Sequence, residues 1–182
     1  ISDSCTYASM LEKKFDYRNT FLHTDPVLDL SLPIPEALRG TLDFVVCSDV
    51  MEHVQPPVLS AFSNLRSLLK TGGILVLTVP FGLEGATVEH FPRLHSFEIV
   101  RDGEEATLFN RTVEGDQEVF RDLVFHGGDG STLEMRIFAL PELLAQLQAA
   151  GFRDIRVHNE TIARFGIVNL DPCSTPITAI AS

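Results

Sequence analysis

The sequence predicts an α/β protein with a mostly parallel sheet, and three observations support this fold class. First, residues 41–49 and 73–81 are runs rich in apolar residues, as expected of strands buried on both faces. Second, residues 57–70 have the pattern of an amphipathic helix, which completes a strand–helix–strand crossover. Third, 182 residues suffice for one domain with a full hydrophobic core but not for two. We therefore expect a single domain over residues 1–182.

The elements before the crossover are predicted to be a helix and a short strand. Apolar residues recur at helical spacing over residues 3–15, after an N-cap that is Asp3 or Ser4. Residues 17–25, YRNTFLHTD, are rich in aromatic and β-favouring residues and predict a strand. Three prolines interrupt residues 26–40, which are therefore expected to be extended and loop-like.

The central helix and the segment after the crossover have distinct patterns. The helix over residues 57–70 is expected to end at Gly72, and its inner stripe consists of Val58, Phe62, Leu65 and Leu69. Over residues 82–132, turn signals separate short segments, which predicts a region of β-hairpins inserted between core elements.

The C-terminal part returns to core elements. Helical periodicity resumes over residues 133–152, with Pro141 in the first turn and Gly151 at the end. Residues 152–160 and 175–182 are the predicted closing strands.

Charge and cysteine content limit which binding partners and which cellular compartment we expect for this protein. The net charge of −11 and the pI near 4.8 repel phosphate backbones and anionic membranes, so we expect neither nucleic acid nor membrane as a partner. The sequence has no apolar run approaching the roughly 18 residues of a membrane span. The three cysteines are too few and too scattered for a disulfide framework or a zinc site, which favours a reducing, cytoplasmic location.

Several motifs resemble class I S-adenosylmethionine-dependent methyltransferases. These are LDFVVCSDVMEHVQPP, the helix that follows, LLKTGGILVLTVPF, and the later ALPELLAQLQAAGF before a strand. The resemblance covers residues 17–81 and 134–160. It implies a Rossmann-like three-layer sandwich, in which helices cover both faces of a mostly parallel sheet whose last strand is antiparallel. It also implies S-adenosylmethionine as the cofactor.

The inserted segments extend this resemblance to a subgroup. TVEHFPRLHSFEIV, LFNRT and DLVFHGG resemble bacterial methyltransferase-like proteins associated with glycan-modifying gene products. The implied reaction is methyl transfer to oxygen or nitrogen of a small-molecule or glycan-like acceptor, with residues 82–132 covering the acceptor pocket. The alternative is a catalytically inactive relative that serves as a binding or interaction module.

The resemblance assigns cofactor-binding residues. In such sheets, ligands bind beyond the carboxyl ends of the strands, so Ser48, Asp49 and Val50 are expected beside the methionine moiety. Asp25 either accepts hydrogen bonds from the ribose hydroxyls or starts an Asp-Pro turn. Asp29, followed by Leu30, either meets the adenine amino group or is a solvated loop acid.

Several other polar residues can each be assigned either of two roles. Glu52 and His53 are expected to shape the floor of the crevice; alternatively, with Asp49, they resemble a divalent-metal cluster, but we assign no metal ligand. Three histidines of the inserted region either accept a substrate proton or pack structurally, namely His90, His95 and His126. We assign no catalytic residue, because positioning contributes much of the rate of methyl transfer.

The glycine-rich loop that is typical of the family does not occur in this sequence. We expect that the N-terminal part of the domain, up to and including that loop, is missing from this chain. Asp3 would then lie near the amino-acid end of the cofactor. A missing central strand would leave strand edges unpaired. We expect rearranged pairing to fill the gap, and a homodimer if the pairing strand comes from a second chain.

Overall fold

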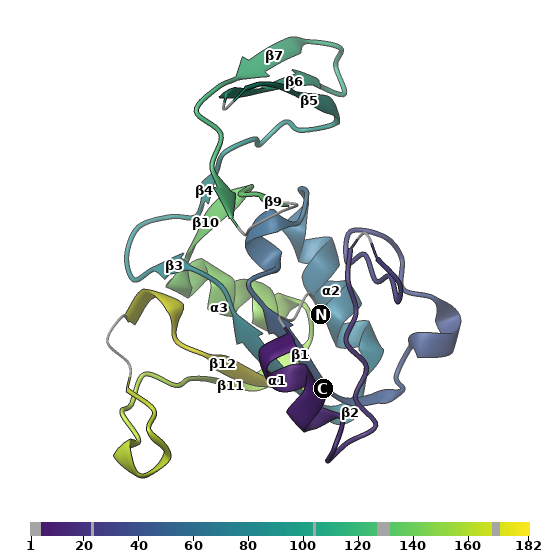
Figure 1. Ribbon diagram of the computed structural model, residues 1–182, viewed down its shortest axis with the longest axis vertical. Coiled ribbons are helices and arrows are strands. Elements are labelled where there is room, and N and C mark those ends of the chain that lie inside the picture. The colour runs from purple at the N-terminus through teal and green to yellow at the C-terminus, as the bar shows by residue number, and fades with distance from the viewer. Residues whose placement is uncertain (1–4, 23, 104, 127–131, 169–171) are drawn as a thin grey trace.

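The central sheet has four strands in the order β1-β2-β12-β11 in the computed structural model (Figure 1). These strands are β1 (Leu42–Ser48), β2 (Leu69–Thr78), β12 (Ile177–Ala181) and β11 (Phe152–Val157). β1 and β2 are parallel, whereas β12 is antiparallel to both β2 and β11. The predicted Rossmann-like α/β fold, with its antiparallel last strand, is confirmed. The structure describes residues 5–22, 24–103, 105–126, 132–168 and 172–182.

The sheet buries one face more completely than the other. Val45 and Leu75 belong to the buried face, whereas Ile74 on the opposite face is 45% exposed. The prediction that both faces of these strands are fully buried was therefore wrong. The reason is the unequal cover: α2 (Val58–Leu68) and α3 (Leu140–Ala149) share one hydrophobic cluster, while the short α1 (Cys5–Leu11) lies on the other side (Figure 1).

Helix α2 buries Val58, Phe62 and Leu65, as its apolar stripe predicts. It ends at Leu68 rather than at Gly72, because the amides of Gly40 and Thr41 bond to the carbonyls of Ser67 and Leu68. Leu69 already belongs to β2.

Gly72 lies inside β2 with a positive φ of 82°, in a stretch where the strand changes register against β1. Leu42 is opposite Leu69, but Phe44 is opposite Ile74. Gly72 therefore permits the irregularity in β2 and does not terminate α2.

The strand predicted over residues 17–25 is wrong, because Phe21 forms only an isolated bridge with Val27. The amide of Phe21 bonds to the carbonyl of Pro26, and the amide of Leu28 bonds to the carbonyl of Phe21. These bonds close a loop on itself. Within the described ranges, β1 is the edge strand of the central sheet, and residues 17–25 do not pair with its free edge. Pairing with a second chain stays a prediction.

The predicted hairpins between residues 82 and 132 are confirmed. β5 (Ser96–Asp102), β6 (Glu105–Arg111) and β7 (Gln117–Phe120) form an antiparallel sheet that projects from the core (Figure 1). A second hydrophobic cluster lies beneath it and contains Phe91 and Leu108. The shorter strands here are β3 (Phe81–Gly82), β4 (Val88–Glu89), β8 (Phe125–His126) and β9 (Thr132–Leu133).

The helical pattern predicted from residue 133 begins later than expected. β10 (Arg136–Ala139) pairs with β3 and β4, and α3 starts only at Leu140. Pro141 lies in the first turn and Gly151 follows the helix with φ of 94°, both as predicted. Short 3₁₀ helices complete the fold: η1 (Glu36–Leu38), η2 (Met51–His53), η3 (Ala163–Phe165) and η4 (Pro172–Ser174). Among the described residues, no helix is long and apolar enough to cross a membrane.

Candidate functional site

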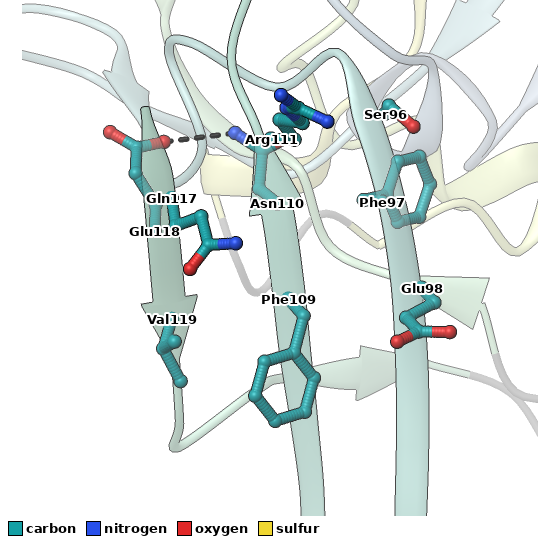
Figure 2. A pocket seen from close by; sticks show the side chains of 9 residues that line it. All are labelled: Ser96, Phe97, Glu98, Phe109, Asn110, Arg111, Gln117, Glu118 and Val119. Carbon is teal, nitrogen blue, oxygen red and sulfur yellow. Dashed lines mark hydrogen bonds between the residues drawn. The ribbon is translucent and has the colours of Figure 1, made fainter. Parts of the chain in front are cut away.

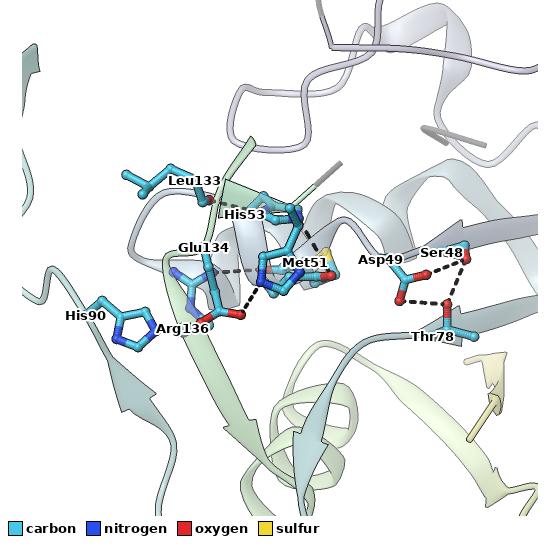
Figure 3. Close-up of polar contacts among 11 residues, drawn as sticks. Ser48, Asp49, Met51, His53, Thr78, His90, Leu133, Glu134 and Arg136 are labelled. Carbon is cyan, nitrogen blue, oxygen red and sulfur yellow. Dashed lines mark hydrogen bonds and ion pairs between the residues drawn. The ribbon is translucent and has the colours of Figure 1, made fainter. Parts of the chain in front are cut away.

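Three polar side chains meet where β1 and β2 end. Ser48 and Thr78 are paired in register, and their hydroxyl oxygens lie 2.8 Å apart. One hydroxyl donates to the other, and the Asp49 carboxylate lies within hydrogen-bonding distance of both, 3.2 Å from Ser48 Oγ and 3.3 Å from Thr78 Oγ1 (Figure 3). The Asp49 amide also donates to the Thr78 carbonyl. An exposed carboxylate is thus fixed at the carboxyl end of two parallel strands, where this class of sheet binds ligands.

The backbone at Asp49 turns the chain from β1 into η2. Its φ of 50° is in the left-handed region, which aspartate and asparagine adopt more readily than other non-glycine residues. Val50 follows and packs, partly buried, against the core. Thr78 was missed by the sequence analysis, although the matching ends of neighbouring parallel strands were a signal for it.

The predicted adenine- and ribose-binding residues lie in a separate loop. Asp29 Oδ1 accepts from the amide and the hydroxyl of Ser31, at 2.8 and 2.7 Å. Leu30 is buried, and its carbonyl accepts from Asn64 Nδ2 of α2 at 2.9 Å. Asp25 is exposed. No contact found within the described part of the chain joins this loop to Asp49, and Asp3 lies outside the described residues, so these binding roles stay predictions.

A second polar group surrounds the buried Glu134, in the turn between β9 and β10. His90 Nε2 lies 2.9 Å from Oε1, and His126 Nε2 lies 2.7 Å from Oε2. We call His90, His126 and Glu134 the histidine–glutamate cluster. His53 adjoins it, because its ring centre is 5.5 Å from that of His126. No set of three or more His, Cys, Asp or Glu side chains in the described ranges is arranged to hold a metal ion.

Burial determines the charge states beside this cluster. Burial raises the pKa of Glu52 to about 8, and the nearby charges of Asp49 and Glu134 act in the same direction. Burial lowers the pKa of His53, whose Nδ1 lies 2.9 Å from the Leu133 carbonyl. The 3.8 Å between Glu52 Oε1 and His53 Nε2 is too long for a hydrogen bond. At neutral pH Glu52 and His53 are therefore largely uncharged.

Arg136 holds these elements together. It is completely buried, and its Nε donates to Glu89 Oε1 at 2.7 Å while Nη1 donates to the Met51 carbonyl at 2.7 Å. The next contact along the chain is from the Met135 amide to the Glu52 carbonyl at 2.8 Å. These bonds fasten β10 to η2. The sequence analysis missed Glu134 and Arg136 because this stretch was interpreted as helical.

A shallow groove of about 400 Å³ lies elsewhere, on the β5–β6–β7 sheet (Figure 2). Phe109 and Val119 expose apolar surface there, and Asn110 bonds to Glu118 at 2.9 Å. His95 belongs to this region, since its amide donates to Asn110 Oδ1, so it is not part of the histidine–glutamate cluster. Because the sheet projects away from β1 and β2, the groove is separate from the site at Asp49 (Figure 1).

Comparison with known families gives a match over most of the chain. The sequence model of a family described as "Methyltransferase domain" matches residues 16–157. No curated protein matches the sequence.

Comparison with solved structures gives matches of low sequence identity. One is a 1,6-didemethyltoxoflavin-N1-methyltransferase from Burkholderia thailandensis, solved with 1,6-didemethyltoxoflavin and S-adenosylhomocysteine bound (15% identity, 84% of this chain, 48% of that chain, TM-score 0.41). Another is an S-adenosylmethionine-dependent methyltransferase from Mesorhizobium loti (18% identity, 85% and 68%, TM-score 0.45). A third is from Clostridium acetobutylicum (13% identity, 84% and 61%, TM-score 0.42). The chain spans about half the length of the first of these proteins.

Proposed function

We propose a function from one premise: this chain belongs to the family of methyltransferase domains. The methyl donor of that family is S-adenosylmethionine. We infer that the chain binds this donor beside Ser48, Asp49 and Val50. It then transfers the methyl group to oxygen or nitrogen of a small-molecule or glycan-like acceptor.

The observation that carries the proposal is the position of Asp49. Its carboxylate is exposed at the carboxyl ends of β1 and β2, and the hydroxyls of Ser48 and Thr78 hold it in place. The donor offers a cationic ammonium group and ribose hydroxyls, all of which donate hydrogen bonds to a carboxylate. An acid that is already held by its neighbours loses little side-chain entropy when it binds such a group. The residues present therefore fit this cofactor.

The loop acids fit the remainder of the donor. Both bonds from Ser31 use Asp29 Oδ1, so Oδ2 remains available to accept from the adenine amino group. Asp25 is exposed and offers two oxygens to vicinal hydroxyls. The buried Leu30 anchors this loop, because Asn64 binds its carbonyl.

The chemistry divides between the donor and the protein. When bound, the donor supplies a methyl group on a good leaving group, so the chain itself needs mainly to orient the two reactants. Asp49 would orient the donor from the strand ends. His53, largely uncharged and with 12% of its side chain exposed, would border the acceptor, with the buried Glu52 behind it.

Calorimetric titration with S-adenosylhomocysteine tests this proposal. We expect wild type to bind, and Asp49→Asn to bind more weakly by about 1–3 kcal/mol, because it loses the charge but tolerates the left-handed backbone. Asp43→Asn is the matched control, since Asp43 is exposed and pairs with Lys70 on the surface. No binding by wild type at millimolar ligand would support the alternative, a non-catalytic binding or interaction module.

A further inference from the structure

We propose that the histidine–glutamate cluster binds the acceptor and takes the proton from its hydroxyl group. The inference rests on the proposed function and concerns the acceptor side of the same site. It is carried by the meeting of His90 and His126 at the buried carboxylate of Glu134, to which β4 brings His90 from 44 residues earlier and the β8–β9 hairpin brings His126.

The geometry determines which imidazole nitrogen can accept a proton. Each oxygen of Glu134 lies within 2.9 Å of one Nε2, and an oxygen and a nitrogen lone pair repel at such a distance unless a proton lies between them. Nε2 therefore carries the hydrogen in both rings. The lone pair of each neutral ring is then on Nδ1, which is the nitrogen able to accept a proton.

Exposure separates the roles of the three side chains. The Glu134 side chain is 7% exposed, while those of His90 and His126 are 27% and 39% exposed. The carboxylate is thus the buried support and the rings are the reachable groups. In such an arrangement the carboxylate orients the imidazole and stabilises the positive charge that it acquires.

The cluster lies next to the strand-end site. His53 follows Asp49 by four residues through η2, and its ring touches that of His126. Figure 3 shows Glu134 and His90 on one side of Met51, with Ser48, Asp49 and Thr78 on the other. The acceptor would lie over His53, within reach of the exposed rings of His90 and His126.

The charges around the cluster limit the class of acceptor. Two carboxylates lie near it, Glu134 in the cluster and Asp49 at the strand ends, whereas Glu52 and His53 are largely uncharged at neutral pH. Arg136 is engaged with Glu89, and Arg101 lies over the Phe125 ring of β8. An anionic acceptor, such as a phosphorylated sugar, would be repelled. We infer a hydroxylated compound that carries no anionic group.

The proton-transfer step balances within the cluster. The acceptor O–H bond breaks, a new N–H bond forms at Nδ1 of His90 or His126, and the electron pair stays on the acceptor oxygen. Glu134 compensates the charge of the resulting imidazolium. The methyl group that this oxygen receives is supplied by the donor.

Nitrogen-15 NMR of the histidine side chains tests the inference on the protein loaded with S-adenosylhomocysteine. We expect His90 and His126 to carry hydrogen on Nε2. We also expect Nδ1 of at least one of them to shift on addition of methyl glucoside, but not with glucose 6-phosphate. Glu134→Gln should abolish these shifts, whereas His95→Asn, a histidine outside the cluster, should preserve them. His90→Gln and His126→Gln provide the same test if Glu134→Gln does not fold.

Each result has one meaning. Hydrogen on Nδ1 in both rings, or methyl glucoside leaving both rings unchanged while S-adenosylhomocysteine binds, would overturn the inference and leave the proposed function standing. Failure of S-adenosylhomocysteine to bind would overturn the proposed function, and with it the inference that depends on it.

Discussion

Arg136 Nη1 donates a 2.7 Å hydrogen bond to the carbonyl oxygen of Met51, 85 residues earlier in the sequence. The same guanidinium is fully buried and pairs through Nε with Glu89. One side chain therefore ties β10 to both η2 and β4. The strand-end site and the histidine–glutamate cluster keep their relative positions through it.

Arg136→Met should destabilise the protein by about 3–5 kcal/mol, because it leaves the partner carboxylate and carbonyl without their donor. Denaturant unfolding monitored by circular dichroism gives the free energy. Arg153→Met is the matched control, since its pair with Asp154 is on the surface, and its change should stay within about 1 kcal/mol. Equal losses in the two variants would contradict the role assigned to Arg136.

Gly73→Ala should also destabilise the fold. A Cβ at this position would lie 2.9 Å from the Lys70 carbonyl oxygen and 3.2 Å from that of Asp43, both of which are backbone atoms. The strands must shift to relieve the contact, which costs about 1–3 kcal/mol. Gly82→Ala is the control, because its nearest contact is an ordinary 3.5 Å. Thermal unfolding of both variants tests the prediction, and an unchanged midpoint for Gly73→Ala would refute it.

The crossover was predictable because it depends on local periodicity. The stripe at Val58, Phe62 and Leu65 is buried as its spacing indicates, and the apolar runs on either side form β1 and β2. The end of the helix was not predictable. Gly72 resembles a helix stop, yet bonds from Gly40 and Thr41, which precede the helix by many residues, end it earlier.

The candidate site was predictable only where it follows from strand order. Ser48 and Asp49 lie at a strand end, as an apolar run that turns polar indicates. Glu134 was missed because residues 133–152 were interpreted as one helix, and because His90, one of the two histidines that contact it, lies 44 residues earlier in the sequence. Residues 17–25 were predicted to be a strand although they do not form one. High β propensity produces a strand only where another strand is available to pair with it.

Cys47 should resist alkylation in the native protein. Its side chain is completely buried in β1, and burial raises the pKa of the thiol to about 12, so almost none is the reactive thiolate at pH 8. Iodoacetamide treatment followed by mass spectrometry should show Cys47 unmodified before denaturation and modified after it. Cys173, which is only partly buried, serves as the comparison and should react faster. Rapid native modification of Cys47 would show that β1 opens.

Glu52 should make the stability of the protein depend on pH. Burial raises its pKa from 4.5 to about 8, so between these values the folded protein binds more protons than the unfolded chain. Its contribution to the free energy of unfolding is therefore complete below pH 4.5 and is lost as the pH rises towards 8. The lowered pKa of His53 acts in the opposite direction. As the pH falls below 6.5, this histidine takes up a proton more readily in the unfolded chain than in the folded protein, and the free energy of unfolding decreases.

Glu52→Gln isolates the first of these effects. The variant keeps the shape of the side chain but cannot ionise, so its stability relative to wild type should increase steadily from pH 4.5 to 8. Urea unfolding at several pH values measures this difference, in which the His53 contribution largely cancels because both proteins contain it. Gln55→Ala, an exposed and uncharged neighbour, should differ from wild type by the same amount at every pH. A difference for Glu52→Gln that is likewise constant would mean that Glu52 ionises in the folded protein as readily as in the unfolded chain.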